Sequence, residues 1–313
     1  MAIRVKNPGM FSSIQDLGRY GYAHLGISVV GAADRLSLRI ANLLVGNPDN
    51  APALEMTLLG ATLEFEERRI VALAGADCGA KVGTSLLPMG EAVEVPAGGV
   101  LKCGGMKTGA RSYLALQGGF AVPAVMGSTA TDVRGRFGGL EGRRLKAGDL
   151  LPVQDERDAR ARRLRPGILD TVSRHDTLRV SRGAQQEWFG PEAFELLFST
   201  PYSISDQSDR TGLRLKGESL RPREQSQLLT DGIPLGAVQV PQDGQPIILF
   251  VDQQTTGGYP KIANVIMADM HHVGQLRPHE QVRFQEVSIP QAIALLKEQE
   301  LWLRNAFVNS QLG

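Results

Sequence analysis

The residues best suited to chemistry follow an apolar run in the C-terminal half of the chain. The run Ile247–Val251 is almost wholly apolar, which is typical of a strand buried on both faces. After it come an acid, two amides, two hydroxyls, paired glycines, a tyrosine and a lysine. These residues are Asp252, Gln253, Gln254, Thr255, Thr256, Gly257, Gly258, Tyr259 and Lys261. Because paired glycines let the backbone approach a ligand closely, we predict that this segment binds a small polar molecule.

Two other segments place an acid and an arginine close to glycines. Asp16 and Arg19 occur in the first, and Asp209 and Arg210 occur in the second. An arginine in such a turn is able to hold a carboxylate or phosphate through two parallel hydrogen bonds. The alternative is structural: a local ion pair at the first turn, and a side-chain-stabilised turn before a strand at the second. The residues alone leave both interpretations open.

Several familiar sites are excluded. No two glycines are separated by one residue, so the dinucleotide-binding G-x-G-x-x-G pattern cannot occur. The phosphate-binding G-x-x-x-x-G-K-[ST] loop is missing too, so any ATP would be held differently. His271 and His272 are adjacent, which is poor spacing for two ligands on one face, so we predict no metal site at this pair. A glycine-rich stretch from Phe137 to Arg143 is either a set of turns or an anion-facing loop.

Composition indicates a globular protein of a reducing compartment. The chain has 313 residues, 42% hydrophobic and 21% charged, with a net charge of +1, so we expect neither a nucleic-acid nor a membrane partner. Cys78 and Cys103 are the two cysteines and form no C-x-x-C pair, as expected for free thiols. The start of the chain lacks a signal-peptide pattern, and no apolar stretch reaches the roughly 18 residues of a membrane span. We therefore expect a cytoplasmic protein.

The spacing of 36 glycines and 17 prolines between short apolar runs favours many strands over a helical bundle. Helices are predicted over Asp34–Val45, with Asp34 as N-cap, over Pro191–Phe198, and from Ser288 to about Ala306 behind a Ser288/Gln291 capping box. Strands are predicted over Ala61–Phe65, Ile70–Leu73, Ala92–Val95, Tyr113–Leu116, Leu178–Val180, Ile247–Val251 and Val282–Phe284. The charged stretch Gln154–Arg174 has no apolar period and is interpreted as a linker.

Several stretches carry a resemblance to one family. The most specific is DQQTTGGYPKIA at 252–263; the others begin at Ser13, Arg111, Phe137 and Ser208. The chain resembles the allophanate hydrolase subunit 2 family, also called the biotin-dependent carboxyltransferase family. This resemblance implies a mainly β fold of two linked cyclophilin-like β-barrel domains with a few short helices. The domains are expected at 1–160 and at 161–313, the second including the C-terminal helix.

Within this family, the resemblance implies the C subunit of a prokaryotic ATP-dependent 5-oxoprolinase. Its partners would be the A and B subunits of that enzyme, the latter of the Kip inhibitor or allophanate hydrolase subunit 1 type. Together they would convert 5-oxo-L-proline to L-glutamate with ATP hydrolysis, using ATP with Mg²⁺. Where the family often has Gly-Pro-Gln, this chain has Gly183-Ala184-Gln185, which removes no reactive group.

Roles for the candidate residues follow as hypotheses under that resemblance. Arg19 and Arg210, beside Asp16 and Asp209, would hold anionic groups. Asp252 would bind magnesium or act as a base, and Lys261 would supply positive charge. The substrate would be positioned by Gln254, Thr255, Thr256, Gly257, Gly258 and Tyr259.

Two alternatives stay open on the sequence. One is the carboxyltransferase component of a biotin-dependent urea carboxylase, which would need a separate biotin carrier, because the lysine context that accepts biotin is missing. The other is a regulatory binding protein like the Kip antagonist.

Overall fold

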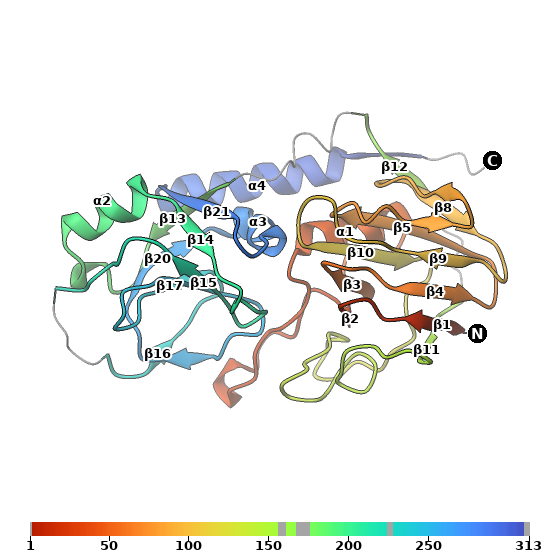
Figure 1. Cartoon of the computed structure of the whole chain (residues 1–313), viewed down its shortest axis with the longest axis horizontal. Coiled ribbons are helices and arrows are strands. Elements are labelled where there is room, and N and C mark those ends of the chain that lie inside the picture. Colours follow the sequence, from red (N-terminus) through yellow and green to blue (C-terminus); the bar gives the residue numbers. More distant parts are fainter. Residues whose placement is uncertain (1, 156–160, 167–175, 224–227, 310–313) are drawn as a thin grey trace. The chain divides into compact units, whose positions relative to one another are not determined.

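The computed structural model describes residues 2–155, 161–166, 176–223 and 228–309. The chain forms two compact units, coloured mainly red to yellow-green and green to blue in Figure 1. Unit 1 comprises Met1–Arg19, Val30–Ser173 and Trp302–Gly313, and unit 2 comprises Tyr20–Val29 and Arg174–Leu301. This division differs from the predicted border at 160/161. No sequence signal predicted that a segment near each end of the chain would join the other unit.

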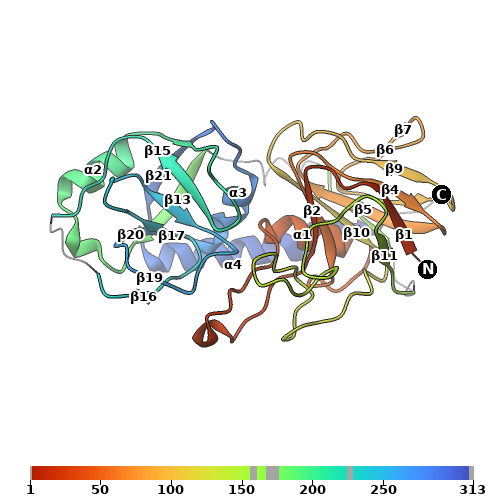
Figure 2. The same cartoon turned by 60° about the horizontal axis from the view of Figure 1, so that its bottom comes forward.

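Unit 1 is built from two antiparallel sheets that share a core. The strands of the six-stranded sheet are, in order, β11 (Leu150–Pro152), β1 (Ala2–Asn7), β4 (Thr62–Phe65), β9 (Val100–Lys102), β6 (Lys81–Val82) and β7 (Ser85–Leu86). Those of the five-stranded sheet are β2 (Phe11–Gln15), β3 (Ala53–Thr57), β10 (Arg111–Leu116), β5 (Arg69–Gly75) and β8 (Ala92–Val95). Figure 2 shows β6 and β7 at the outer end of their sheet.

The alternation of side chains along β10 explains how unit 1 obtains two cores. Leu114 and Leu116 point into the core between the two sheets. Tyr113 and Ala115 point to the opposite face and pack in a second core with helix α1 (Arg35–Leu44). All of β10 is buried, and its last four residues, Tyr113–Leu116, present apolar side chains to both faces.

Helix α1 begins where the sequence predicts. The Asp34 carboxylate accepts hydrogen bonds from the Ser37 backbone N–H at 2.9 Å and from the Ser37 hydroxyl at 2.6 Å. The helix ends before Gly46, whose φ of 75° is a left-handed conformation that glycine adopts without strain. The predicted N-cap is confirmed, and the helix ends one residue before the predicted Val45.

Asp34→Ala is expected to lower the free energy of unfolding by about 1–2 kcal/mol, because a buried helix start loses its N-cap acceptor. A shift of the urea midpoint, with circular dichroism as the signal, measures this loss. Ser37→Ala removes only the hydroxyl contact and should cost less. An Asp34→Ala protein as stable as the parent would show that the cap contributes nothing.

Unit 2 is a closed seven-stranded barrel, which confirms the predicted barrel for the C-terminal half. Its strands are, in order, β13 (Thr177–Arg182), β20 (Lys261–Val265), β17 (Ala237–Gln239), β18 (Ile247–Leu249), β15 (Gly212–Lys216), β14 (Tyr202–Ile204) and β21 (Gln281–Glu286). A separate two-stranded ladder pairs β16 (Asp231–Gly232) with β19 (Thr256–Gly257). The described helices of this unit include α2 (Pro191–Ser199), α3 (Met270–Gln275) and the 3₁₀ turns Ala23–Leu25, Gln186–Trp188 and Met267–Asp269.

The remaining elements lie near the predicted linker and at the C-terminal end. Helix α4 (Ile289–Asn305) starts at the predicted capping box, where the Ser288 N–H donates to Gln291 Oε1 at 2.8 Å. Part of the predicted linker, 156–160 and 167–174, lies outside the described residues. Between these gaps, β12 (Arg162–Leu164) pairs with β22 (Phe307–Asn309), so a linker interpretation is wrong for this stretch.

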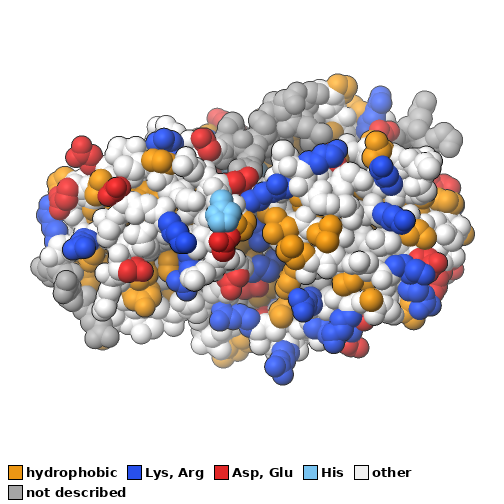
Figure 3. All heavy atoms as spheres, viewed as in Figure 1, with side chains coloured by type: hydrophobic (Ala, Val, Ile, Leu, Met, Phe, Trp, Pro, Cys, Tyr) orange, Lys and Arg blue, Asp and Glu red, His pale blue; other side chains and the backbone are white. Residues whose placement is uncertain are grey.

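The mainly β class with few helices is confirmed. Among the described residues, none of the helices combines the length and apolarity needed to traverse a lipid bilayer. Acidic and basic side chains are interspersed on the face in Figure 3, in keeping with the small net charge.

Candidate functional site

A buried lysine lies at the centre of the candidate site in unit 2. Lys261 is the first residue of β20, and only 2% of its surface is exposed. Its ammonium donates to Asp231 Oδ2 at 2.7 Å and to the Gly232 carbonyl at 3.3 Å. Hydrogen bonds to the Asp231 carboxyl, first of all the one from Lys261, lower its pKa. A buried ammonium held by one half-exposed carboxylate can stabilise negative charge that develops beside it.

The glycine-rich segment closes around this lysine through the β16–β19 ladder. Gly257 pairs with Asp231 across the ladder. A Cβ at Gly257 would lie 2.7 Å from Ile233 Cδ1, 3.2 Å from Gln239 Nε2 and 3.5 Å from Gln254 Nε2. Glycine at this position thus leaves room for the ends of these three side chains, which would have to shift for a larger residue. Gln254 thus lies near Gly257, and Gly257 pairs with the aspartate that binds Lys261; their predicted roles in substrate binding remain predictions.

Gln185 fixes the backbone of the lysine. The Lys261 N–H donates to Gln185 Oε1 at 3.2 Å, and the Gln185 N–H donates to the Lys261 carbonyl at 3.2 Å. Gln185 Nε2 also lies 3.4 Å from Asp231 Oδ2. Sequence reasoning missed the parts that Gln185, Asp231 and Gln239 play. The Asp231-Gly232 dipeptide reads as an ordinary turn, and only the tertiary fold brings it to Lys261.

Gly183→Ala is expected to displace Lys261 and to destabilise unit 2 by about 1–3 kcal/mol. The new Cβ would lie 2.1 Å from the Lys261 carbonyl oxygen and 2.8 Å from the Ala263 nitrogen, so the backbone must move. Gly232→Ala is the matched control, because a Cβ there meets nothing within 4 Å. Equal urea midpoints for the two variants would contradict this expectation.

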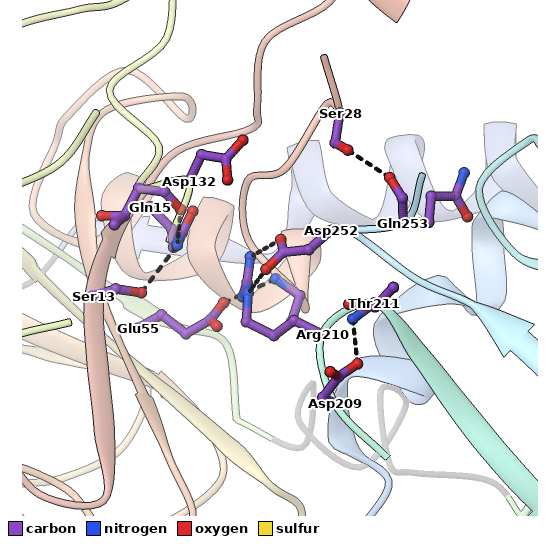
Figure 4. A network of polar contacts seen from close by, with 12 residues as sticks. Ser13, Gln15, Ser28, Glu55, Asp132, Asp209, Arg210, Thr211, Asp252 and Gln253 are labelled. Carbon is purple, nitrogen blue, oxygen red and sulfur yellow. Dashed lines mark hydrogen bonds and ion pairs between the residues drawn. The ribbon is translucent and has the colours of Figure 1, made fainter. Parts of the chain in front are cut away.

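Arg210 and Asp252 form a two-pronged ion pair on neighbouring segments of the barrel (Figure 4). Arg210 Nε lies 2.9 Å from Asp252 Oδ2, and Arg210 Nη2 lies 3.0 Å from Asp252 Oδ1. Each side chain is about 10% exposed. The Asp252 N–H also donates to the Arg210 carbonyl at 2.8 Å. The sequence predicted both residues in the site but not that each would be the other's partner.

This pairing bears on the predicted roles of both residues. Because both oxygens of Asp252 accept hydrogen bonds from Arg210, they do not match the open carboxylate that Mg²⁺ prefers. Among the described residues, no three acidic, histidine or cysteine side chains are grouped so that they could hold a metal ion. The donor set therefore does not fit a resident magnesium ion, and we assign this chain no step through one.

Other residues of unit 2 near Arg210 and Asp252 make hydrogen bonds that involve backbone groups. Asp209 Oδ1 accepts the Thr211 N–H at 2.7 Å, which is the turn role that the structural alternative describes. The Ser28 hydroxyl donates to the Gln253 carbonyl at 2.5 Å, so the segment 20–29 is tied to this loop. The Thr255 carbonyl accepts the Ile233 N–H at 3.0 Å. Thr256, Gly258 and Tyr259 lie on the exposed side of the loop.

Asp16 organises a loop within unit 1. Its carboxylate accepts hydrogen bonds from the hydroxyls of Ser128 (2.7 Å) and Thr129 (2.9 Å) and from the N–H groups of Gly18 (2.7 Å) and Thr129 (2.6 Å). With four donors in place, this carboxylate is a structural anchor. Its predicted role in substrate binding remains a prediction.

Arg19 is enclosed by the same loop of unit 1. It is 1% exposed, donates to the Ala130 carbonyl at 2.5 Å and stacks 4.6 Å from the ring centre of Phe137. A Cβ at Gly138 would lie 2.1 Å from the Ala130 carbonyl and 2.9 Å from Arg19 Nη2. The glycine-rich stretch is thus explained by close packing. The predicted anion-holding role of Arg19 is untested, and its burial does not favour that role.

Comparison with known proteins places this geometry in a family context. The family profile of the carboxyltransferase domain, subdomains A and B, matches residues 25–286. The chain is 41% identical to the 5-oxoprolinase C subunit of Escherichia coli over 299 residues, which is 95% of both chains. It is 38% identical to the protein of the same name from Haemophilus influenzae, over 93% of both chains. It is also 30% identical to the urea amidolyase of Saccharomyces cerevisiae, of which it covers 18%.

Solved structures show the same fold. The urea amidolyase of K. lactis superimposes with a TM-score of 0.92 at 30% identity, over 97% of this chain and 20% of that one. The structure of TTHA0988 superimposes with a TM-score of 0.79 at 35% identity, over 91% of this chain and 56% of that one. In these two structures the matching region is one part of a longer chain.

Proposed function

Because the chain belongs to the carboxyltransferase domain family of subdomains A and B, we propose that it acts as the C subunit of an ATP-dependent 5-oxoprolinase. The observation that carries this proposal is the match in both identity and length. At 41% identity the chain covers 95% of a 5-oxoprolinase C subunit, whereas at 30% identity it covers only 18% of a urea amidolyase. A full-length counterpart is a better guide to function than a shared domain.

The proposed reaction opens a lactam that resists water. The 5-oxoproline amide is stabilised by resonance, so transfer of the γ-phosphoryl group of ATP to its oxygen makes the ring carbon easier for water to attack. Negative charge builds up on the oxygens around this transfer, and a fixed cation lowers the energy of that state. Lys261 is the cation that we assign to this role, oriented by Asp231 and Gln185.

The hydrogen-bonding groups beside Lys261 suit a substrate with an amide group. Gln239 and Gln254 each offer an amide donor near Gly257, where the backbone permits close approach. Amide side chains of this kind recognise a lactam N–H and C=O together, because each carries both a donor and an acceptor. Thr255, Thr256 and Tyr259 would contact the remainder of the substrate.

Partners follow from the same proposal. The A and B subunits would be required for turnover, and ATP would be consumed by the assembled complex. The Arg210–Asp252 ion pair would then stabilise the conformation of the loop that follows β18.

The proposal is tested by reconstitution with the A and B subunits, followed by ADP release in the presence of 5-oxo-L-proline, urea or no substrate. ADP release that needs all three proteins and 5-oxoproline supports the proposal. Release that needs urea and a biotin carrier instead would assign the chain to the carboxyltransferase step of a urea carboxylase, which the urea amidolyase similarity favours as the second candidate.

A further inference from the structure

The only two cysteines of the chain meet in the core between the sheets of unit 1. Cys78 lies in the connection from β5 to β6, and Cys103 directly follows β9. The Gly104 N–H donates to the Cys78 carbonyl at 2.8 Å, which joins the two segments. The two thiols lie within hydrogen-bonding reach of one another, and both are free. A Cβ at Gly60 would lie 2.3 Å from Cys103 Cβ, so Gly60 leaves the space that Cys103 occupies.

The surroundings of the two sulfur atoms differ. The Cys103 thiol donates a hydrogen bond to Cys78 and thereby lowers the pKa of Cys78, and the Ser112 hydroxyl acts in the same direction. The neighbouring Cys78 and burial raise the pKa of Cys103. Cys78 is therefore the better nucleophile, with Cys103 beside it as the second thiol.

Access depends on local opening at the edge of the six-stranded sheet. Cys78 is 1% exposed and Cys103 is 5% exposed, so neither reacts from the closed state with a large reagent. From Cys78 the chain runs into β6 and β7, which are two residues long each and end the sheet in Figure 2. Leu86 in β7 is 65% exposed, and the nearby Lys107–Asp77 ion pair lies at the surface. Short edge strands with exposed contacts open more readily than a core.

We propose that Cys78 and Cys103 are a reversible thiol oxidation site that forms an intramolecular disulfide on reaction with a hydroperoxide. The Cys78 thiolate attacks one peroxide oxygen, the O–O bond breaks, and hydroxide leaves, which gives Cys78 sulfenic acid. The Cys103 sulfur then attacks Cys78, the S–O bond breaks, and water leaves with the Cys103 proton. In sum, two thiols and one hydrogen peroxide give one disulfide and two waters.

The test uses the full chain treated with hydrogen peroxide, then denatured, alkylated and mapped by peptide mass spectrometry. The expected product is one peptide pair cross-linked through Cys78 and Cys103, which a dithiol reductant separates. Two alkylated thiols after treatment, or a sulfinic acid on Cys78 without a cross-link, would overturn the proposal. So would a cross-link that appears only after the protein has been unfolded.

Variants distinguish the proposed order of steps. Cys103→Ser should leave Cys78 to accumulate sulfenic and then sulfinic acid, whereas Cys78→Ser should leave Cys103 largely unmodified. Ser112→Ala should slow cross-linking, because the Cys78 thiol loses the neighbouring hydroxyl that helps to lower its pKa. If either cysteine variant fails to fold, the rate of Cys78–Cys103 cross-linking in Ser112→Ala, compared with that in the parent protein, still tests the role of Cys78. An unchanged or faster rate would contradict the assigned role of Cys78.

Discussion

Replacing Lys261 with methionine is expected to reduce 5-oxoproline-dependent ADP release by about 10²–10³-fold in the reconstituted complex. Methionine keeps most of the side-chain volume but removes the buried ammonium that Asp231 holds at 2.7 Å. The chain should still fold, because Asp231 is half exposed and its charge is solvated when the lysine is gone. Steady-state kinetics measures the effect, and the loss should fall mainly on kcat.

Two further variants separate chemistry from folding at this position. Lys216→Met removes an exposed lysine from the same barrel and should leave turnover unchanged. Asp231→Asn keeps the shape of the lysine's partner, removes its charge and should reduce turnover less than Lys261→Met does. Lys261→Met protein that folds, assembles and retains near-normal turnover would remove Lys261 from the catalytic machinery.

The second large effect is on stability. Asp252→Ala is expected to destabilise unit 2 by about 3–5 kcal/mol, because it leaves the Arg210 guanidinium buried without its carboxylate. Urea unfolding measures this effect. Glu286→Ala is the matched control, since it removes the partner of Arg182 from an exposed pair of the same barrel and should cost at most about 1 kcal/mol.

The double variant Arg210→Met/Asp252→Leu should regain most of the stability lost in Asp252→Ala, because a buried ion pair is replaced by apolar side chains. If turnover returns with stability, Asp252 acts only on the shape of the loop. If stability returns and turnover does not, one of the two charges takes part in the reaction. A double variant no more stable than Asp252→Ala would contradict the assigned cost of removing the Asp252 carboxylate from Arg210.

Most of the secondary structure could be predicted from local signals. The Asp34 cap, the proline at the start of α2 and the Ser288/Gln291 box are short-range features, and each marks its helix correctly. Apolar runs bounded by turn residues located strands for the same reason. Strand β18 ends at Leu249 rather than Val251, because Phe250 and Asp252 turn to bond with Thr211 and Arg210.

Contacts between residues far apart in the chain could not be predicted from the sequence. Strand β12 pairs with β22, and residues 20–29 belong to unit 2 although the residues on either side of them belong to unit 1. Both arrangements join residues far apart in the chain, and neither produces a periodic pattern in the sequence. The same is true of the candidate site. Lys261 and Gly257 stand out by composition, but Asp231 and Gln185 become significant only because the barrel carries them to the lysine.

The most direct measurement follows L-glutamate formed from 5-oxo-L-proline by the A and B subunits with ATP, with and without this chain. We expect glutamate and ADP in equal amounts when the chain is present, and neither above background when it is omitted. Full glutamate formation by A and B alone, or none with all three proteins assembled, would contradict the proposed function.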